Sequence, residues 1–187
     1  MNSQLVSIWF GRQFKYLHPE IRELHTHGGV LKGVVDVSFG AGLGQFLGQR
    51  LARKMNIPGE GSHQFSVEIS HHSDGLHWDR TFNHSTKIKS IFTPVGTIEN
   101  GYWLEETGPL KMRLTVDIRE GGWHWRYLGF RFMGIPLPRQ LFPELEAYKT
   151  IENGLYRFHV GLSVPIIGSI LVYRGLLNVE HSVRHEC

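Results

Sequence analysis

A five-residue segment of this 187-residue chain, Trp78-Asp79-Arg80-Thr81-Phe82, places a charged side chain between two large aromatic ones. Because side chains of a β-strand alternate between its faces, Trp78, Arg80 and Phe82 would share one face. If that face is buried, the guanidinium keeps its charge and needs a carboxylate, backbone carbonyls or the anion of a ligand. Two interpretations stay open. One is structural, an internal ion pair or a stacked arginine at the rim of a barrel; the other is a site that binds the anion of a ligand.

The second group of candidate residues lies between His18 and His25. On a helix His18, Arg22 and His25 would share one side, which places a cation between two groups that can carry a proton. This arrangement could bind an anion or transfer protons. The alternative is a histidine that caps the helix beside a solvated helix face.

The twelve histidines of the chain suggest a metal site, but their spacing completes no zinc-protease or zinc-finger pattern. The closest pairs are His25 with His27, His71 with His72, and His181 with His185. The single cysteine, Cys187, excludes an intrachain disulfide and a multi-cysteine metal site. The sequence also has no nucleophile elbow, phosphate loop or dinucleotide fingerprint. We therefore predict no metal and no cofactor.

Two helical regions near the N-terminus and a long run of strands must position these residues. Apolar residues at steps of three and four predict a helical N-terminal region and a short helix over about residues 19–25. A strand over Leu31–Phe39 and an amphipathic helix over Leu43–Met55 follow. Gly44 and Gly48 on this second helix would let it approach a sheet closely.

From residue 63 onward the apolar period changes to two, as in Phe65, Val67 and Ile69. Similar runs return later in the chain, separated by short turn signals such as Asn153-Gly154 that favour antiparallel pairing. We predict a mainly β (α+β) fold, a strongly curved antiparallel sheet or half-barrel of roughly 8–10 strands. The N-terminal helices pack on it, with the Leu43–Met55 helix across its concave side. Such sheets often leave a cavity for a small apolar ligand.

Composition indicates one ordinary globular domain over residues 1–187, with a core at about 14–178 and a flexible tail at 179–187. The net charge of +3 comes from scattered lysines and arginines, which argues against nucleic-acid binding. No apolar run approaches the ~20 residues of a membrane span, and the first ten residues do not resemble a signal peptide. We therefore expect a cytoplasmic protein.

Several short phrases point to a known family when taken together. They are Leu17-His18-Pro19 with Leu24-His25, Trp78-x-Arg80-x-Phe82, Glu106-x-Gly108-Pro109, Gly134-Ile135-Pro136-Leu137-Pro138, and Pro165-x-x-Gly168 running into Tyr173-Arg174-Gly175-x-Leu177. Over about residues 14–177 the chain resembles the bacterial family of domain of unknown function 4166. That family has no established activity, and its members look like stand-alone domains or appendages to Rossmann-type oxidoreductases. Because the chain lacks a dinucleotide-binding part, the resemblance implies at most a partner oxidoreductase.

Three functions follow as hypotheses. In the first, the sheet binds a small, partly apolar and anionic molecule, such as an acyl or isoprenoid-like acid, with Arg80 at the anionic end and Tyr173 as a further contact. In the second, an enzyme uses His18 or His25 as proton carrier and Arg80 to stabilise negative charge. In the third, the domain docks on a partner oxidoreductase. An enzyme of this kind needs a histidine within reach of the cavity, whereas docking needs an exposed apolar patch.

Overall fold

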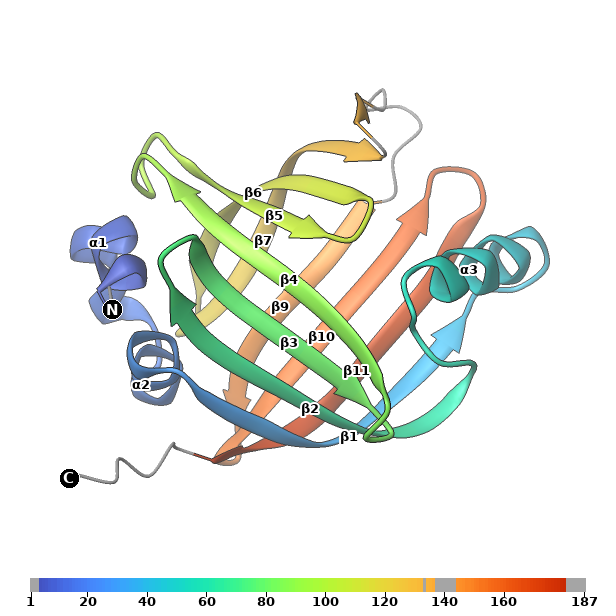
Figure 1. The fold of residues 1–187 in the computed structure, drawn as a ribbon, viewed down its shortest axis with the longest axis horizontal. Helices are drawn as coiled ribbons and strands as arrows, with labels where there is room; N and C mark the ends of the chain where they lie inside the picture. The colour runs from blue at the N-terminus through green and yellow to red at the C-terminus, as the bar shows by residue number, and fades with distance from the viewer. Residues whose placement is uncertain (1–3, 133, 137–143, 181–187) are drawn as a thin grey trace.

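The fold is given by a computed structural model that describes residues 4–132, 134–136 and 144–180 (Figure 1). The helical elements are α1 (Leu5–Phe10), the 3-10 helix η1 (Gly11–Tyr16), α2 (Pro19–His27) and α3 (Leu43–Lys54). The strands are β1 (Gly29–Phe39), β2 (Gly61–His72), β3 (Gly75–Phe82), β4 (Thr86–Val95), β5 (Tyr102–Thr107), β6 (Leu110–Arg119), β7 (Gly122–Phe132), β8 (Ile135–Pro136), β9 (Glu144–Glu152), β10 (Leu155–Val164) and β11 (Gly168–Glu180).

Ten of these strands form a closed antiparallel barrel, and β8 adds a short hairpin to β7. From β1 to β7, and from β9 to β11, each strand pairs with its neighbour in the sequence, and β7 pairs with β9. Pairing of β1 with β11, from Val30–Glu180 to Phe39–Leu171, closes the barrel. The expected half-barrel was therefore wrong, because the first strand supplies the partner that an open sheet edge lacks. This pairing also places Val179 and Glu180, expected in a flexible tail, inside β11; residues 181–187, with His181 and His185, lie outside the described residues.

The predicted alternation of buried and exposed side chains is confirmed along the strands. Phe65, Val67 and Ile69 on β2 are all buried, as are Leu114 and Val116 on β6. The turn signals are confirmed as well. At Asn153-Gly154 both residues have positive φ, 51° and 76°, which suits the tight turn between β9 and β10.

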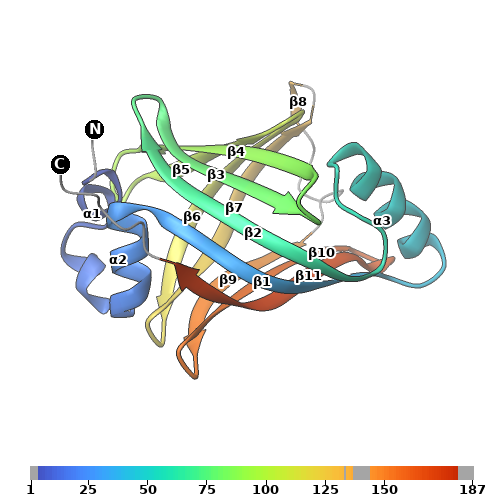
Figure 2. The ribbon, with the colours of Figure 1, turned by 60° about the horizontal axis from the view of Figure 1, so that its bottom comes forward.

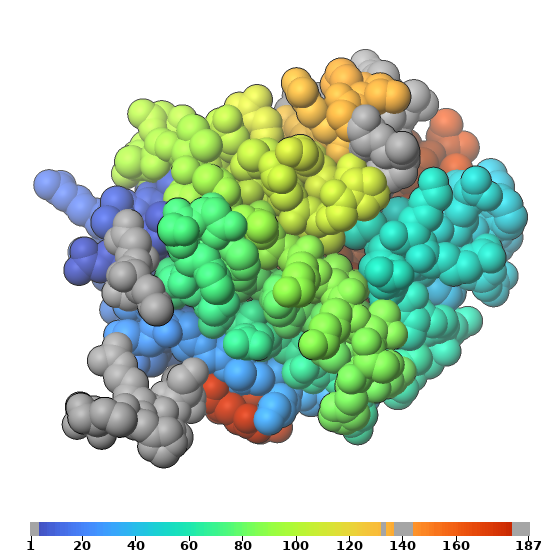
Figure 3. All heavy atoms as spheres, in the orientation of Figure 1, coloured from blue at the N-terminus to red at the C-terminus, as the bar shows by residue number. Residues whose placement is uncertain are grey.

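The helices cover opposite ends of the barrel (Figures 1 and 2). At one end α1, α2 and the residue after η1 supply an apolar plug, all of it buried: Val6, Trp9, Phe10, Leu17, Ile21 and Leu24. At the other end α3 packs mainly against β11. Its cyan atoms lie at the right of Figure 3. The N-terminal helix pair, and not the Leu43–Met55 helix, is therefore the part that fills the barrel from within.

Helix α3 contacts the barrel through its glycines and not through the whole apolar stripe. Leu43 and Phe46 belong to the apolar stripe of the helix that was expected to lie across the concave side of the sheet, but they are 60% and 58% exposed. Gly44 and Gly48 are buried, and an ideal Cβ on Gly48 would lie 1.8 Å from the carbonyl oxygen of Ile170 on β11. The close approach expected from the two glycines is thus confirmed, and it turns the helix so that part of its apolar stripe faces outward.

Gly48→Ala should destabilise the protein by about 1–3 kcal/mol, because the new methyl group meets a backbone carbonyl that cannot move aside freely. The same change in a free helix would stabilise the helix by about 1 kcal/mol. The sign of the change in the free energy of unfolding therefore shows whether α3 packs tightly on β11. Chemical denaturation measures the effect, with Gly59→Ala as control because no atom lies within 4 Å of its Cβ position. A neutral or stabilising Gly48→Ala would contradict the tight packing of α3.

Among the described residues, no helix is both long enough and apolar enough to cross a membrane.

Candidate functional site

An apolar cavity of about 290 Å³ lies inside the barrel, toward the end covered by α3. Leu51, Met55 and Ile57, from α3 and the loop after it, contribute to its wall. The strands supply mostly aliphatic and aromatic side chains, including Leu114, Phe130, Leu145, Phe158 and Leu162. Polar side chains are few and include Arg80, Glu105, Thr107, Lys149 and Tyr173. This combination of an apolar wall with a few polar groups is typical of a small-molecule site.

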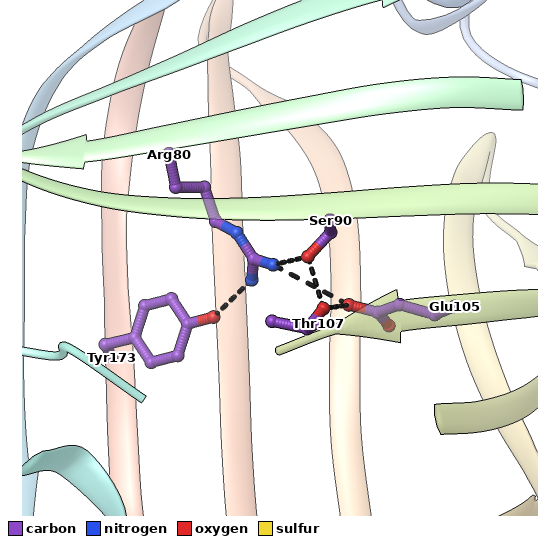
Figure 4. A network of polar contacts seen from close by, with 5 residues as sticks. All are labelled: Arg80, Ser90, Glu105, Thr107 and Tyr173. Carbon is purple, nitrogen blue, oxygen red and sulfur yellow. Dashed lines mark hydrogen bonds and ion pairs between the residues drawn. The ribbon is translucent and has the colours of Figure 1, made fainter. Parts of the chain in front are cut away.

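Arg80 is the centre of a buried polar network that spans the barrel (Figure 4). Its side chain projects inward from β3 and is 8% exposed. The guanidinium donates hydrogen bonds to the Tyr173 hydroxyl at 3.0 Å and to the Ser90 hydroxyl, and its Nη2 lies 3.6 Å from Oε1 of Glu105. Arg80 therefore forms the internal ion pair that was one of its two interpretations.

Neighbouring hydroxyl groups hold the Glu105 carboxylate in this network. Thr107 donates a hydrogen bond to Oε1 of Glu105 at 2.9 Å and also contacts the Ser90 hydroxyl. Burial raises the pKa of Tyr173, so its phenol stays protonated. Since its oxygen accepts from Arg80, the Tyr173 proton is available to an acceptor in the cavity.

The aromatic neighbours of Arg80 differ in their position. Trp78 is buried and lines the cavity with Arg80 and Tyr173. Phe82 is buried too, but it packs against Phe65 at 4.7 Å between ring centroids and is not among the described residues that line the cavity. The inward direction of Trp78, Arg80 and Phe82 is confirmed; Phe82 serves the core.

Lys149 on β9 adds a buried amine at the cavity wall. Its side chain is 2% exposed, and Nζ has no hydrogen-bond partner among the described residues. Nζ lies 3.6 Å from the ring centroid of Trp78, 4.0 Å from that of Trp123 and 5.3 Å from that of Trp125. Burial lowers the pKa of Lys149 well below its ordinary value; Glu105 opposes this shift and Arg80 adds to it.

His18, Arg22 and His25 do not form one site, because they lie in different surroundings along helix α2. His18 is the N-cap, where Nδ1 accepts a hydrogen bond from the backbone N–H of Glu20 at 3.3 Å, and Arg22 is half-buried. His25 is fully buried at the plugged end, where it stacks on Trp78 with 5.4 Å between ring centroids. Burial lowers the pKa of His25, so it is neutral there. None of the three is among the described residues that line the cavity.

Sequence reasoning missed Glu105 and Lys149. Glu105 alternates with Trp103 and Thr107, which are also buried, on the inward face of β5. That pattern, once β5 was assigned, would have suggested a carboxylate facing inward. Lys149 carries the corresponding signal, because it follows Leu145 and Ala147 at steps of two on β9. No set of three or more His, Cys, Asp or Glu residues among those described could hold a metal ion.

Comparison with known proteins assigns a family but no activity. The family model described as "Domain of unknown function (DUF4166)" matches residues 17–177. A search of curated proteins finds no match. The partner oxidoreductase and the cytoplasmic location stay predictions.

Proposed function

The chain belongs to the DUF4166 family, which is uncharacterised, and we propose that its barrel binds a small, largely apolar molecule in the interior cavity. The observation that carries this proposal is the cavity of about 290 Å³ with its mainly apolar wall. Ligand sites usually have volumes of about 300–1,000 Å³, so the ligand belongs at the small end of that range. Apolar ligand surface removed from water contributes about 25 cal/mol per Å² to binding.

The polar groups of the wall favour a ligand with one uncharged polar end. Arg80 already has the Glu105 carboxylate at 3.6 Å, and a second anion beside it would be repelled by that carboxylate. The anionic end expected from the sequence is therefore less favoured than a neutral oxygen. Such an oxygen could accept the Tyr173 proton at little electrostatic cost.

The enzyme hypothesis loses the two proton carriers that it named, and the docking hypothesis gains no specific support. His18 caps a helix and His25 is buried in the plugged end, so neither offers a proton carrier to the cavity. A different histidine, His159 on β10, is among the residues that line the cavity. Exposed Leu43 and Phe46 on α3 offer an apolar surface, but nothing about them selects an oxidoreductase as partner.

Ala147→Leu should weaken binding of an apolar probe by about tenfold or more, which corresponds to about 1.4 kcal/mol. Ala147 on β9 is buried and lines the cavity, so the larger side chain occupies the space of the ligand. Fluorescence titration with N-phenyl-1-naphthylamine, followed by displacement with decanol, measures the effect. Ala41→Leu is the control, because Ala41 is exposed.

Both variants should unfold cooperatively, so a loss of binding in Ala147→Leu alone points to the cavity. Failure of the parent protein to bind the probe or decanol would overturn the proposed function. Equal affinities for the parent and Ala147→Leu would place the bound probe outside the barrel and would have the same consequence.

A further inference from the structure

Three properties of Lys149 together suggest a role beyond packing. It is buried, its amine has no acceptor among the described residues, and Trp78 and Trp125, over which the amine lies, both line the cavity. Trp123, the third ring, contacts Phe10 of the N-terminal plug at 4.7 Å between centroids. The amine thus stands where the plugged end of the barrel meets the open cavity.

A lysine confined in this way is reactive when it is neutral. Indole faces attract an ammonium ion, but removal of the charge from water opposes the protonated form. Burial lowers the pKa of Lys149, and the positive charge of Arg80 adds to this effect. Desolvation and a nearby cation are the two conditions that activate lysine amines as nucleophiles toward carbonyl compounds.

We propose that Lys149 is a carbonyl-binding residue, whose amine condenses reversibly with the aldehyde or ketone group of a small apolar molecule held in the cavity. The inference rests on the proposed function, since the cavity must first hold the molecule. It also accounts for the neutral polar end, because a carbonyl brings no charge toward Glu105.

The reaction needs no oxidant, reductant or further reactant. The Lys149 nitrogen attacks the carbonyl carbon and forms a C–N bond, while one N–H proton moves to the carbonyl oxygen to give a carbinolamine. The C–O bond then breaks, the second N–H proton leaves with the hydroxyl group as water, and a C=N imine remains. Water reverses both steps, so the bound molecule can be released unchanged.

Reductive trapping tests this inference in the full-length chain. The protein is incubated with decanal near neutral pH, sodium cyanoborohydride reduces any imine, and peptide mass mapping locates the decyl groups. We expect Lys149 to be modified at least about tenfold faster than any surface lysine, because its amine lines the cavity that holds the aldehyde. Excess decanol, which fills the cavity but lacks a carbonyl, should protect Lys149.

Two variants test whether the fast modification belongs to Lys149. Lys149→Met removes the amine, so the total rate of decyl incorporation should fall to that of the surface lysines. Lys89→Met should behave like the parent, because Lys89 is exposed and its side chain points away from the cavity.

The outcomes distinguish the inference from the function on which it rests. Probe binding without fast modification of Lys149, or modification spread over surface lysines and insensitive to decanol, overturns the role of Lys149 and leaves the binding function intact. Absence of both probe and decanol binding overturns the binding function itself, and the carbonyl site with it.

Discussion

Arg80→Met is expected to lower the free energy of unfolding by about 3–5 kcal/mol, because it leaves the Glu105 carboxylate buried without its cation. Glu105 is buried, and the hydrogen bond from Thr107 cannot by itself replace the lost charge. Methionine also cannot donate the hydrogen bonds that the Ser90 and Tyr173 hydroxyls accept from Arg80. Arg80→Lys keeps the charge but not the forked geometry, so a smaller loss is expected.

A double variant shows whether the stranded carboxylate causes the loss. In Arg80→Met/Glu105→Leu both charges are gone, and apolar replacement of a buried pair is often close to neutral. We therefore expect the double variant to regain most of the stability that Arg80→Met loses. Urea denaturation of the four proteins completes a double-mutant cycle.

The matched control is the exposed ion pair on the neighbouring hairpin, where Nζ of Lys111 lies 2.7 Å from Oε1 of Glu106. Lys111→Met should cost less than about 1 kcal/mol, since water screens this pair. If Arg80→Met costs no more than Lys111→Met, or if removing Glu105 gives no recovery, the buried network does not stabilise the barrel as described.

The local structure of the barrel was predictable because it depends on neighbouring residues. A period of two assigns the inward face of a strand, and it placed Arg80 inside before any partner was known. The Asn153-Gly154 turn is also determined by the local sequence, because asparagine and glycine are among the few residues that adopt positive φ readily.

Closure of the barrel and the composition of the cavity depend on distant residues instead. Nothing in the sequence near β1 indicates that β11 will pair with it, and without this pairing the barrel would be an open, curved sheet. Likewise Arg80 and Glu105 lie on β3 and β5, and they meet only because both face the same interior. The position of α3 was predictable only in part. Its glycines indicated close packing on the sheet, but they did not indicate which apolar residues of the helix would face outward.

Lys149→Met is expected to stabilise the protein near neutral pH. A buried polar group without a hydrogen-bond partner costs about 1–3 kcal/mol, and methionine fills a similar volume without that cost. The sign of the stability change distinguishes a neutral Lys149 amine from a charged one. If Lys149 were a charged ammonium held by its three indole rings, methionine would lose the cation–π attraction and would destabilise the protein.

The pH dependence of this stabilisation provides the sharper measurement. Because burial lowers the pKa of Lys149 in the folded protein, the unfolded chain binds one more proton at any pH between the folded and the unfolded pKa. The stability of the parent should therefore rise with pH over that range, by at most about 1.4 kcal/mol per pH unit. Lys149→Met lacks this term, so its advantage should shrink as the pH rises from neutral toward about pH 10. Denaturation of the parent, Lys149→Met and the exposed control Lys89→Met at several pH values decides the matter. If the advantage of Lys149→Met stays constant with pH, or if the variant is less stable at every pH, Lys149 is charged in the folded barrel. A charged amine would remove the chemical basis for its reaction with a carbonyl.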